Sequence, residues 1–141
     1  MRIDDSKRLT SRQRADASEV IVRRGEVGIG IVCADVIDAR NILQATLLAM
    51  QQAIEDLPRP PDIVLIDGHL GPPVSMPCWP IIDGDQRSYV ISCASIVAKV
   101  LRDEMMRFYD ELFPSYGFRQ HKGYGTALHA KIGRASCRER V

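Results

Sequence analysis

Two aspartates follow short apolar runs, at positions where a strand could end. Asp67 comes directly after the run from Ile63 to Ile66, and Asp85, 18 residues further on, closely follows Ile81 and Ile82. Open α/β sheets place ligands beyond the carboxyl ends of their strands, so the two carboxylates could converge. Such oxygen ligands suit a hard divalent ion such as Mg²⁺, which keeps water molecules for a phosphate substrate. An ordinary Asp-Gly turn is the alternative.

Two further aspartates compete with this pair for a role in chemistry. Asp83 lies between the second apolar run and Asp85, and Asp103 follows Arg102 within a helical pattern. In a helix, opposite charges three or four residues apart commonly form ion pairs on the solvent side. We therefore expect Asp103 to form a solvated ion pair.

A segment near the C-terminus interleaves basic, aromatic and glycine residues. Its basic and aromatic members are Tyr116, Phe118, Arg119, His121, Lys122 and Tyr124. Basic side chains can contact phosphates, and an aromatic ring can stack on a base or sugar. Packing of this segment against the core is the alternative, and composition alone favours it. By themselves, Ser6 and Lys7 indicate only a helix cap and a solvated cation.

Alternating helices and strands must position these residues. In the first half, Thr10 and Gln13 have the spacing of a capping box, which predicts a helix over residues 11–24. The apolar run from Val27 to Cys33 predicts a strand. Asp38 is the expected N-cap of a helix whose apolar positions recur from Ile42 to Leu57.

In the second half, the run from Ile63 to Ile66 predicts a strand covered on both faces. Residues 71–80 contain four prolines and are expected to be irregular. A brief strand at Ile81 and Ile82 follows. A helix over about residues 90–112 is expected to bury a stripe of apolar residues, namely Ala94, Ala98, Leu101, Met105, Phe108 and Leu112. The expected class is therefore α/β.

Composition indicates one globular domain. The chain has 141 residues, of which 45% are hydrophobic and 26% charged. Its apolar runs are far shorter than the roughly 18 residues of a membrane span. Charges rather than an apolar core follow Met1, so we expect a cytoplasmic protein with no membrane partner. The four cysteines are widely separated, and we interpret them as reduced.

The last ten residues, IGRASCRERV, have no apolar period. Their back-translation reads as a widely used sequencing adapter, so we interpret residues 132–141 as adapter read-through and residues 1–131 as the protein. A basic tail is the alternative. Without the three arginines and one glutamate of this segment, the formal net charge changes from +1 to −1.

Taken in order, five segments resemble bacterial ribonuclease HII, the type 2 ribonuclease H. They are DDSKRLT, ARNILQATLLAMQQAI, VLIDG, IIDGDQRSYVISCASIVAKVLRDEMM and FPSYGFRQHKGYGTALH. The resemblance covers nearly all of residues 4–130, and HKGYGT is among its most specific strings. It implies a ribonuclease H-like fold with a mixed sheet flanked by helices. It also implies an endonuclease that cuts the RNA strand of RNA/DNA hybrids and acts at ribonucleotides embedded in duplex DNA.

The resemblance further implies four metal-binding carboxylates, of which two match Asp67 and Asp85. They would hold Mg²⁺ or Mn²⁺ for two-metal hydrolysis that leaves a 5′-phosphate and a 3′-hydroxyl. Tyr124 would pack against the sugar beside the ribonucleotide. Ser6, Lys7 and Lys122 would lie near the substrate backbone. We expect the enzyme to be a monomer.

The family's first strand carries Asp-Glu-Ala-Gly-Arg-Gly, which supplies the other two carboxylates, and no such string occurs in this chain. The family's C-terminal helices are also missing. We therefore expect residues 1–131 to be part of a catalytic domain, with weak Mg²⁺ binding and no activity as they stand. The alternatives are a remnant that only binds a hybrid duplex, and another metal-dependent phosphohydrolase.

Overall fold

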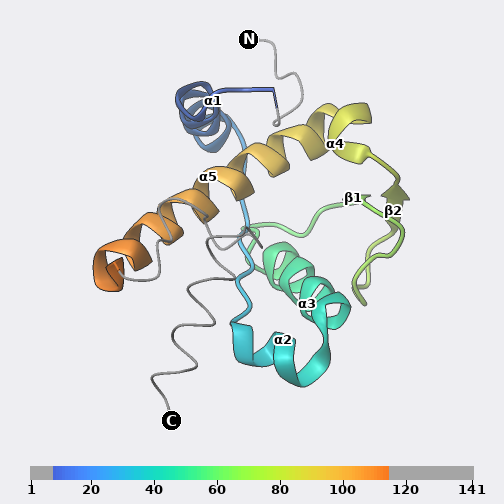
Figure 1. Cartoon of the computed structure of the whole chain (residues 1–141). Coiled ribbons are helices and arrows are strands. Elements are labelled where there is room, and N and C mark those ends of the chain that lie inside the picture. The colour runs from blue at the N-terminus through green and yellow to red at the C-terminus, as the bar shows by residue number, and fades with distance from the viewer. Residues whose placement is uncertain (1–7, 115–141) are drawn as a thin grey trace. The chain divides into compact units, whose positions relative to one another are not determined.

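The computed structural model describes residues 8–114, and it confirms the predicted α/β class. The elements are α1 (Ser11–Arg24), α2 (Ala34–Arg40), α3 (Ile42–Glu55), β1 (Val64–Asp67), β2 (Cys78–Ile81), α4 (Gly84–Arg87) and α5 (Tyr89–Leu112) (Figure 1). The chain forms two compact units, Met1–Ile96 and Val97–Val141, and the boundary between them lies within α5.

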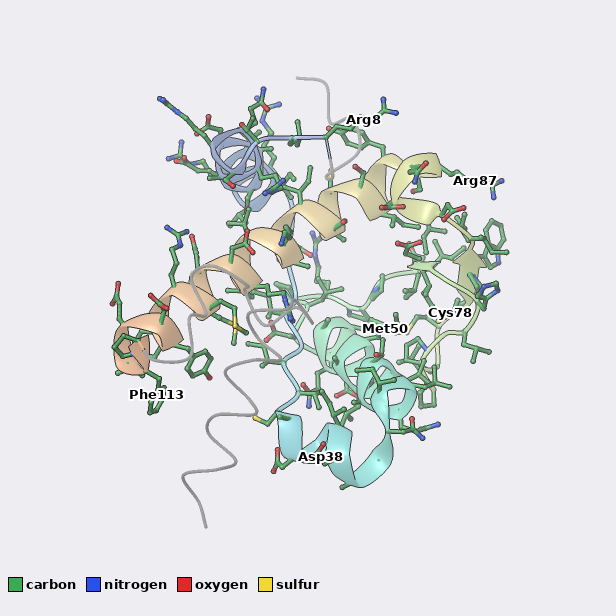
Figure 2. All side chains as sticks on the ribbon, viewed as in Figure 1. Arg8, Asp38, Met50, Cys78, Arg87 and Phe113 are labelled. Carbon is green, nitrogen blue, oxygen red and sulfur yellow. The ribbon has the colours of Figure 1, made fainter. Side chains whose placement is uncertain are left out.

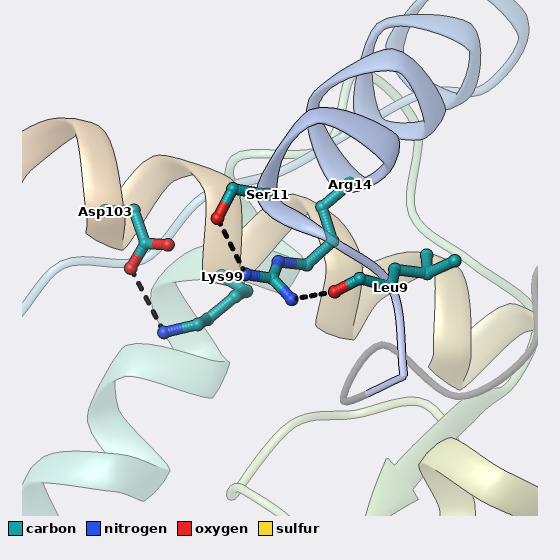
Figure 3. Close-up of polar contacts among 5 residues, drawn as sticks. All are labelled: Leu9, Ser11, Arg14, Lys99 and Asp103. Atoms are coloured by element: carbon teal, nitrogen blue, oxygen red, sulfur yellow. Dashed lines mark hydrogen bonds and ion pairs between the residues drawn. The ribbon is translucent and has the colours of Figure 1, made fainter.

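Helix α1 begins where its capping box predicts. The Thr10 hydroxyl accepts a hydrogen bond from the Gln13 backbone N–H at 3.3 Å, and the Gln13 side chain accepts one from the Thr10 N–H at 2.9 Å. These two bonds satisfy N–H groups that have no partner inside the helix. Arg14 adds contacts to the Leu9 carbonyl and the Ser11 hydroxyl (Figure 3).

The prediction that Asp38 caps the next helix is wrong. Asp38 lies inside α2, and Asn41 separates α2 from α3 (Figure 2). Asn41 has a φ of 77°, and its side-chain oxygen accepts the Gln44 N–H at 3.0 Å. Asparagine tolerates a positive φ better than most residues and is a strong N-cap, so the chain breaks there.

The predicted strand from Val27 to Cys33 is also wrong. Within the described residues this segment joins no β-ladder, and two of its glycines lie directly against α3. A Cβ on Gly28 would lie 2.0 Å from the Ala53 carbonyl oxygen, and one on Gly30 would lie 1.9 Å from that of Ala49. Close approach to a helix backbone therefore takes the place of sheet pairing.

Polar contacts hold the same segment at its N-terminal end. The Asp56 carboxylate accepts the Ile29 backbone N–H at 2.9 Å, directly after the last turn of α3. The Arg59 guanidinium pairs with the Glu26 carboxylate at 2.6 Å. Exposed ion pairs of this kind contribute little stability, so the glycine contacts set the position of the segment.

Strands β1 and β2 form a parallel pair, with Val64 opposite Cys78 and Asp67 opposite Ile81. The predicted first strand is confirmed, but the second begins at Cys78 within the segment expected to be irregular. The carbonyls of Pro77 and Ile81 both accept hydrogen bonds from the β1 side. Since alternate residues face a partner strand, the Pro80 nitrogen points away from β1, and its missing N–H costs the ladder nothing.

Helix α5 is confirmed at almost its predicted length, but the predicted stripe is not its buried face. Ala94, Ala98, Phe108 and Leu112 are exposed, whereas Ile96 is completely buried and Ile91 is 6% exposed. Apolar residues occur on more than one face of this helix, and periodicity alone does not show which face meets the core. No helix among residues 8–114 is both long and apolar enough to cross a membrane.

Three cysteines of the described region, Cys33, Cys78 and Cys93, are free thiols. Burial raises the pKa of the Cys93 thiol, and a hydrogen bond with Tyr89 opposes that rise. A raised thiol pKa means less thiolate at neutral pH and therefore low reactivity. For Cys93, this agrees with the interpretation of the cysteines as reduced.

The close contact between the glycine segment and α3 yields a stability prediction. Gly28→Ala and Gly30→Ala should each lower the free energy of unfolding by about 1 to 3 kcal/mol, because the new methyl groups collide with helix carbonyls. Gly25→Ala is the matched control, since its Cβ would meet only the Ile21 carbonyl oxygen, at 3.4 Å. Urea unfolding of the three variants measures the difference. Equal stability of all three would contradict the packing described.

Candidate active site

The structure places Asp67 and Asp85 on adjoining elements at one end of the sheet. Asp67 is the last residue of β1, and its side chain is exposed. Asp85 is the second residue of α4 and is only 7% exposed. Helix α4 contacts both strands and lies at their carboxyl ends (Figure 1). This is the end of a parallel sheet at which ligand sites are usually found.

A hydrogen bond joins Asp67 to the start of α4. The backbone N–H of Gly84 donates to Asp67 Oδ1 at 2.8 Å. The ladder continues one residue beyond β1, because the Gly68 N–H donates to the Ile81 carbonyl at 3.0 Å. The residue immediately before Asp85 is therefore in direct contact with the carboxylate of Asp67.

A tight turn carries the chain from β2 into α4. Asp83 has a left-handed backbone, with a φ of 52°, and its carbonyl accepts the Gln86 N–H at 3.0 Å. The Gly84 carbonyl accepts the Ser88 N–H at 2.8 Å, which closes the short helix. Cys78 at the start of β2 and Arg87 at the end of α4 bracket this segment (Figure 2). Asp83 is exposed and takes part in this turn through its backbone.

Gly84 is a residue of this site that the sequence patterns did not single out. It is buried, and a Cβ at this position would lie 2.6 Å from Ile91 Cδ1 and 3.4 Å from Asp67 Cα. A glycine between two aspartates at the end of an apolar run is a weak signal by itself, because the same string also forms ordinary turns.

The donor chemistry of the site suits a hard cation, because two carboxylates lie on adjoining elements. Asp67 uses Oδ1 to accept the Gly84 N–H, which leaves Oδ2 able to accept or coordinate. Among the described residues, no group of three or more His, Cys, Asp or Glu side chains could hold a metal ion. Mg²⁺ is often bound through one or two carboxylates, with water and phosphate oxygens completing its shell. Asp67 and Asp85 fit that pattern.

Asp103 departs from its prediction. It does form an ion pair, because the Lys99 ammonium lies 3.1 Å from its carboxylate one helical turn away (Figure 3). The pair is not solvated, however, since the Asp103 residue is only 8% exposed. The prediction considered the charged surroundings of Asp103 in the sequence, whereas the structure places position 103 among the buried residues of α5.

The four proposed substrate-binding residues, Ser6, Lys7, Lys122 and Tyr124, lie outside the described residues, as does the whole segment from Tyr116 to Gly125. The interpretation of residues 132–141 as adapter read-through likewise concerns residues outside this range. These assignments rest on the sequence.

The chain combines an α/β fold with two aspartates near the carboxyl end of a parallel pair of strands. The family model of ribonuclease HII matches residues 1–135. The chain therefore belongs to the ribonuclease HII family, and the resemblance inferred from its motifs is confirmed.

Individual relatives agree with this assignment. The chain is 48% identical over 130 residues to ribonuclease HII of Chlamydia abortus, covering 90% of this chain and 60% of the relative. It is 52% identical over 130 residues to that of Geotalea daltonii, covering 92% and 60%. It is 48% identical over 128 residues to that of Geobacter sulfurreducens, covering 90% and 59%. The chain thus spans about 60% of the length of these relatives.

The buried ion pair in α5 can be tested by removing its acidic member. Asp103→Ala should lower the free energy of unfolding by about 1 to 3 kcal/mol, because it leaves the Lys99 ammonium without its nearest carboxylate in a partly buried position. Glu104→Ala, at an exposed position one residue later, should change it by less than about 0.5 kcal/mol. Chemical denaturation of both variants provides the comparison. If the two variants were equally stable, the pair would be no more important than an exposed one.

Proposed function

We propose that this chain is part of a ribonuclease that cuts the RNA strand of RNA/DNA hybrids. It would also cut on the 5′ side of ribonucleotides embedded in duplex DNA. The observation that supports this most is the contact between Asp67 and the residue preceding Asp85, within a chain whose residues 1–135 match the ribonuclease HII family. The relatives are named for this activity. The activity belongs to the full-length protein, because this chain spans about 60% of theirs.

In this proposal Asp67 and Asp85 hold Mg²⁺ or Mn²⁺. When bound, such ions supply an activated water and stabilise the leaving 3′-oxygen, which leaves a 5′-phosphate and a 3′-hydroxyl. Asp67 is exposed at the end of β1 and is therefore accessible from solvent. Asp85 is buried and therefore held in one place by its surroundings. No nucleophilic side chain is required, because positioning and charge stabilisation supply the rate.

Recognition of the substrate would fall to residues near the two ends of the chain. Tyr124 would pack against the sugar at the ribonucleotide, and Ser6, Lys7 and Lys122 would contact the backbone. The ribose 2′-hydroxyl is the group that distinguishes RNA from DNA in such a site. All four residues fall within the range that the family model matches.

Residues 1–131 would form part of the catalytic domain. Asp67 and Asp85 would be two of its four metal ligands, and the other two would lie in the part of the relatives that this chain does not span. Because Mg²⁺ affinity depends on the number of carboxylates, the chain by itself should bind the ion weakly.

Removal of either carboxylate provides the first functional test. In the full-length protein, Asp67→Asn and Asp85→Asn should each reduce cleavage by on the order of 100-fold or more, because each removes one anionic metal ligand. The substrate is a duplex with one embedded ribonucleotide, in Mg²⁺ or Mn²⁺, and an all-DNA duplex serves as the control. Circular-dichroism melts identify any variant that has unfolded. Near-normal cleavage by either folded variant would show that the assigned ligand role is wrong.

A different effect is expected at Tyr124. Tyr124→Ala should slow cleavage at an isolated ribonucleotide by about 10- to 100-fold, which corresponds to the roughly 1 to 3 kcal/mol of an aromatic stacking contact. Tyr124→Phe keeps the ring and should retain most of the activity. The dependence of the rate on Mn²⁺ concentration should be the same in both variants. Wild-type rates for Tyr124→Ala would exclude a role in sugar packing.

A further inference from the structure

The N–H of Gly84 contacts a proposed metal ligand, and the proposed function assigns no role to this residue. We propose that Gly84 is a positioning residue, whose backbone holds the Asp67 carboxylate in the orientation needed to share a cation with Asp85. This inference rests on the proposed function, because it concerns the same two carboxylates. It adds a role for the glycine at position 84 and for its contact with Ile91.

The hydrogen bond acts on a side chain that would otherwise be mobile. Asp67 is exposed at the end of a strand, and an exposed aspartate can exchange between rotamers. A hydrogen bond from an N–H to an ionised carboxylate is stronger than one between neutral groups, and at 2.8 Å this bond has good geometry. The hydrogen bond therefore reduces the rotamer freedom of the Asp67 side chain, which cation binding would otherwise have to restrict.

The donor also links the two carboxylates. Gly84 directly precedes Asp85, so a single peptide unit joins the group that orients Asp67 to the residue that carries the second carboxylate. A shift of α4 relative to β1 would change both the hydrogen bond and the position of Asp85. The geometry of the pair therefore depends on the contact between α4 and β1.

Ile91 crowds position 84, so a side chain there would disturb the packing between α4 and the start of α5. A Cβ at position 84 would lie 2.6 Å from Ile91 Cδ1, closer than two carbon atoms can approach. On the other side, it would lie 3.4 Å from Asp67 Cα and 3.5 Å from Asp67 Oδ1. Ile91 is only 6% exposed, so its methyl group cannot simply turn into solvent. Any side chain at this position must therefore push α4 away from Asp67 or repack Ile91.

The test measures Mn²⁺ affinity directly, by the electron paramagnetic resonance signal of free Mn²⁺ in titrations of the full-length protein. Gly84→Ala should weaken Mn²⁺ binding about tenfold, the lower end of the range for a lost partner of a metal ligand. Gly71→Ala is the matched control. Its Cβ would lie 2.8 Å from Ile66 Cδ1 and 3.0 Å from Cys78 Cβ, so it crowds the same sheet without touching the Asp67 carboxylate. Gly71→Ala should lower the melting temperature comparably but leave Mn²⁺ affinity unchanged.

A second substitution distinguishes positioning from general damage. Ile91→Val removes the Cδ1 methyl that the new Cβ would meet, so the double variant Gly84→Ala/Ile91→Val should recover most of the lost affinity. The double variant also supplies the measurement if Gly84→Ala alone does not fold. In an Asp67→Asn background, Gly84→Ala should have no further effect on Mn²⁺ affinity, because it acts through that carboxylate.

The proposal is overturned if Gly84→Ala binds Mn²⁺ as the wild type does, or if Gly71→Ala weakens binding equally. It is also overturned if the double variant shows no recovery. Cleavage of the ribonucleotide-containing duplex is measured in parallel. This distinguishes failure of the proposed ribonuclease function from failure of the positioning role of Gly84. A wild-type protein that binds Mn²⁺ through Asp67 but cuts no such duplex contradicts the proposed function and leaves the role of Gly84 intact.

Discussion

The hydrogen bond from the Gly84 N–H to the Asp67 carboxylate is the contact on which the candidate site depends. It can form only because β1 and β2 run parallel in a register that places Asp67 opposite Ile81. A shift of one residue would turn the Asp67 side chain to the other face of the sheet. The turn at Asp83 then delivers Gly84 to the carboxylate, and α4 begins there. The placement of the two acidic groups therefore depends on both the strand register and the turn geometry.

Elements with a local signal were predictable from the sequence. The capping box of Thr10 and Gln13 predicted the start of α1, and an apolar run ending in Asp-Gly predicted β1. Sequence features whose role depends on contacts with distant parts of the chain led to wrong predictions. The glycines at positions 28 and 30 looked like interruptions of a strand, whereas they are the residues that allow the segment to approach the backbone of α3. This role of the glycines cannot be inferred from the segment alone, because it depends on contact with α3.

The same limit applies to the site. The spacing of Asp67 and Asp85 after two apolar runs predicted that both would lie at strand ends, and the structure places them on adjoining elements. The partner that joins them is a backbone N–H, which every residue except proline possesses, so the hydrogen bond itself has no sequence signature, and the glycine that carries it is only a weak signal. The burial of Asp103 was not predicted for a related reason: the buried residues of α5 include this aspartate as well as Ile91 and Ile96, and hydrophobic periodicity does not detect a buried charge.

Pro80 has a consequence beyond the geometry of β2. Strands at the margin of a sheet expose unpaired backbone groups that can recruit a strand from another molecule, and this recruitment is a common origin of aggregation. Among the described residues β2 has β1 as its neighbour, and the nitrogen of Pro80 lies on the opposite margin, where it offers no donor. An incoming strand would find a gap in the middle of a four-residue template. The strand that leads into the acidic site therefore presents an incomplete edge to an incoming strand.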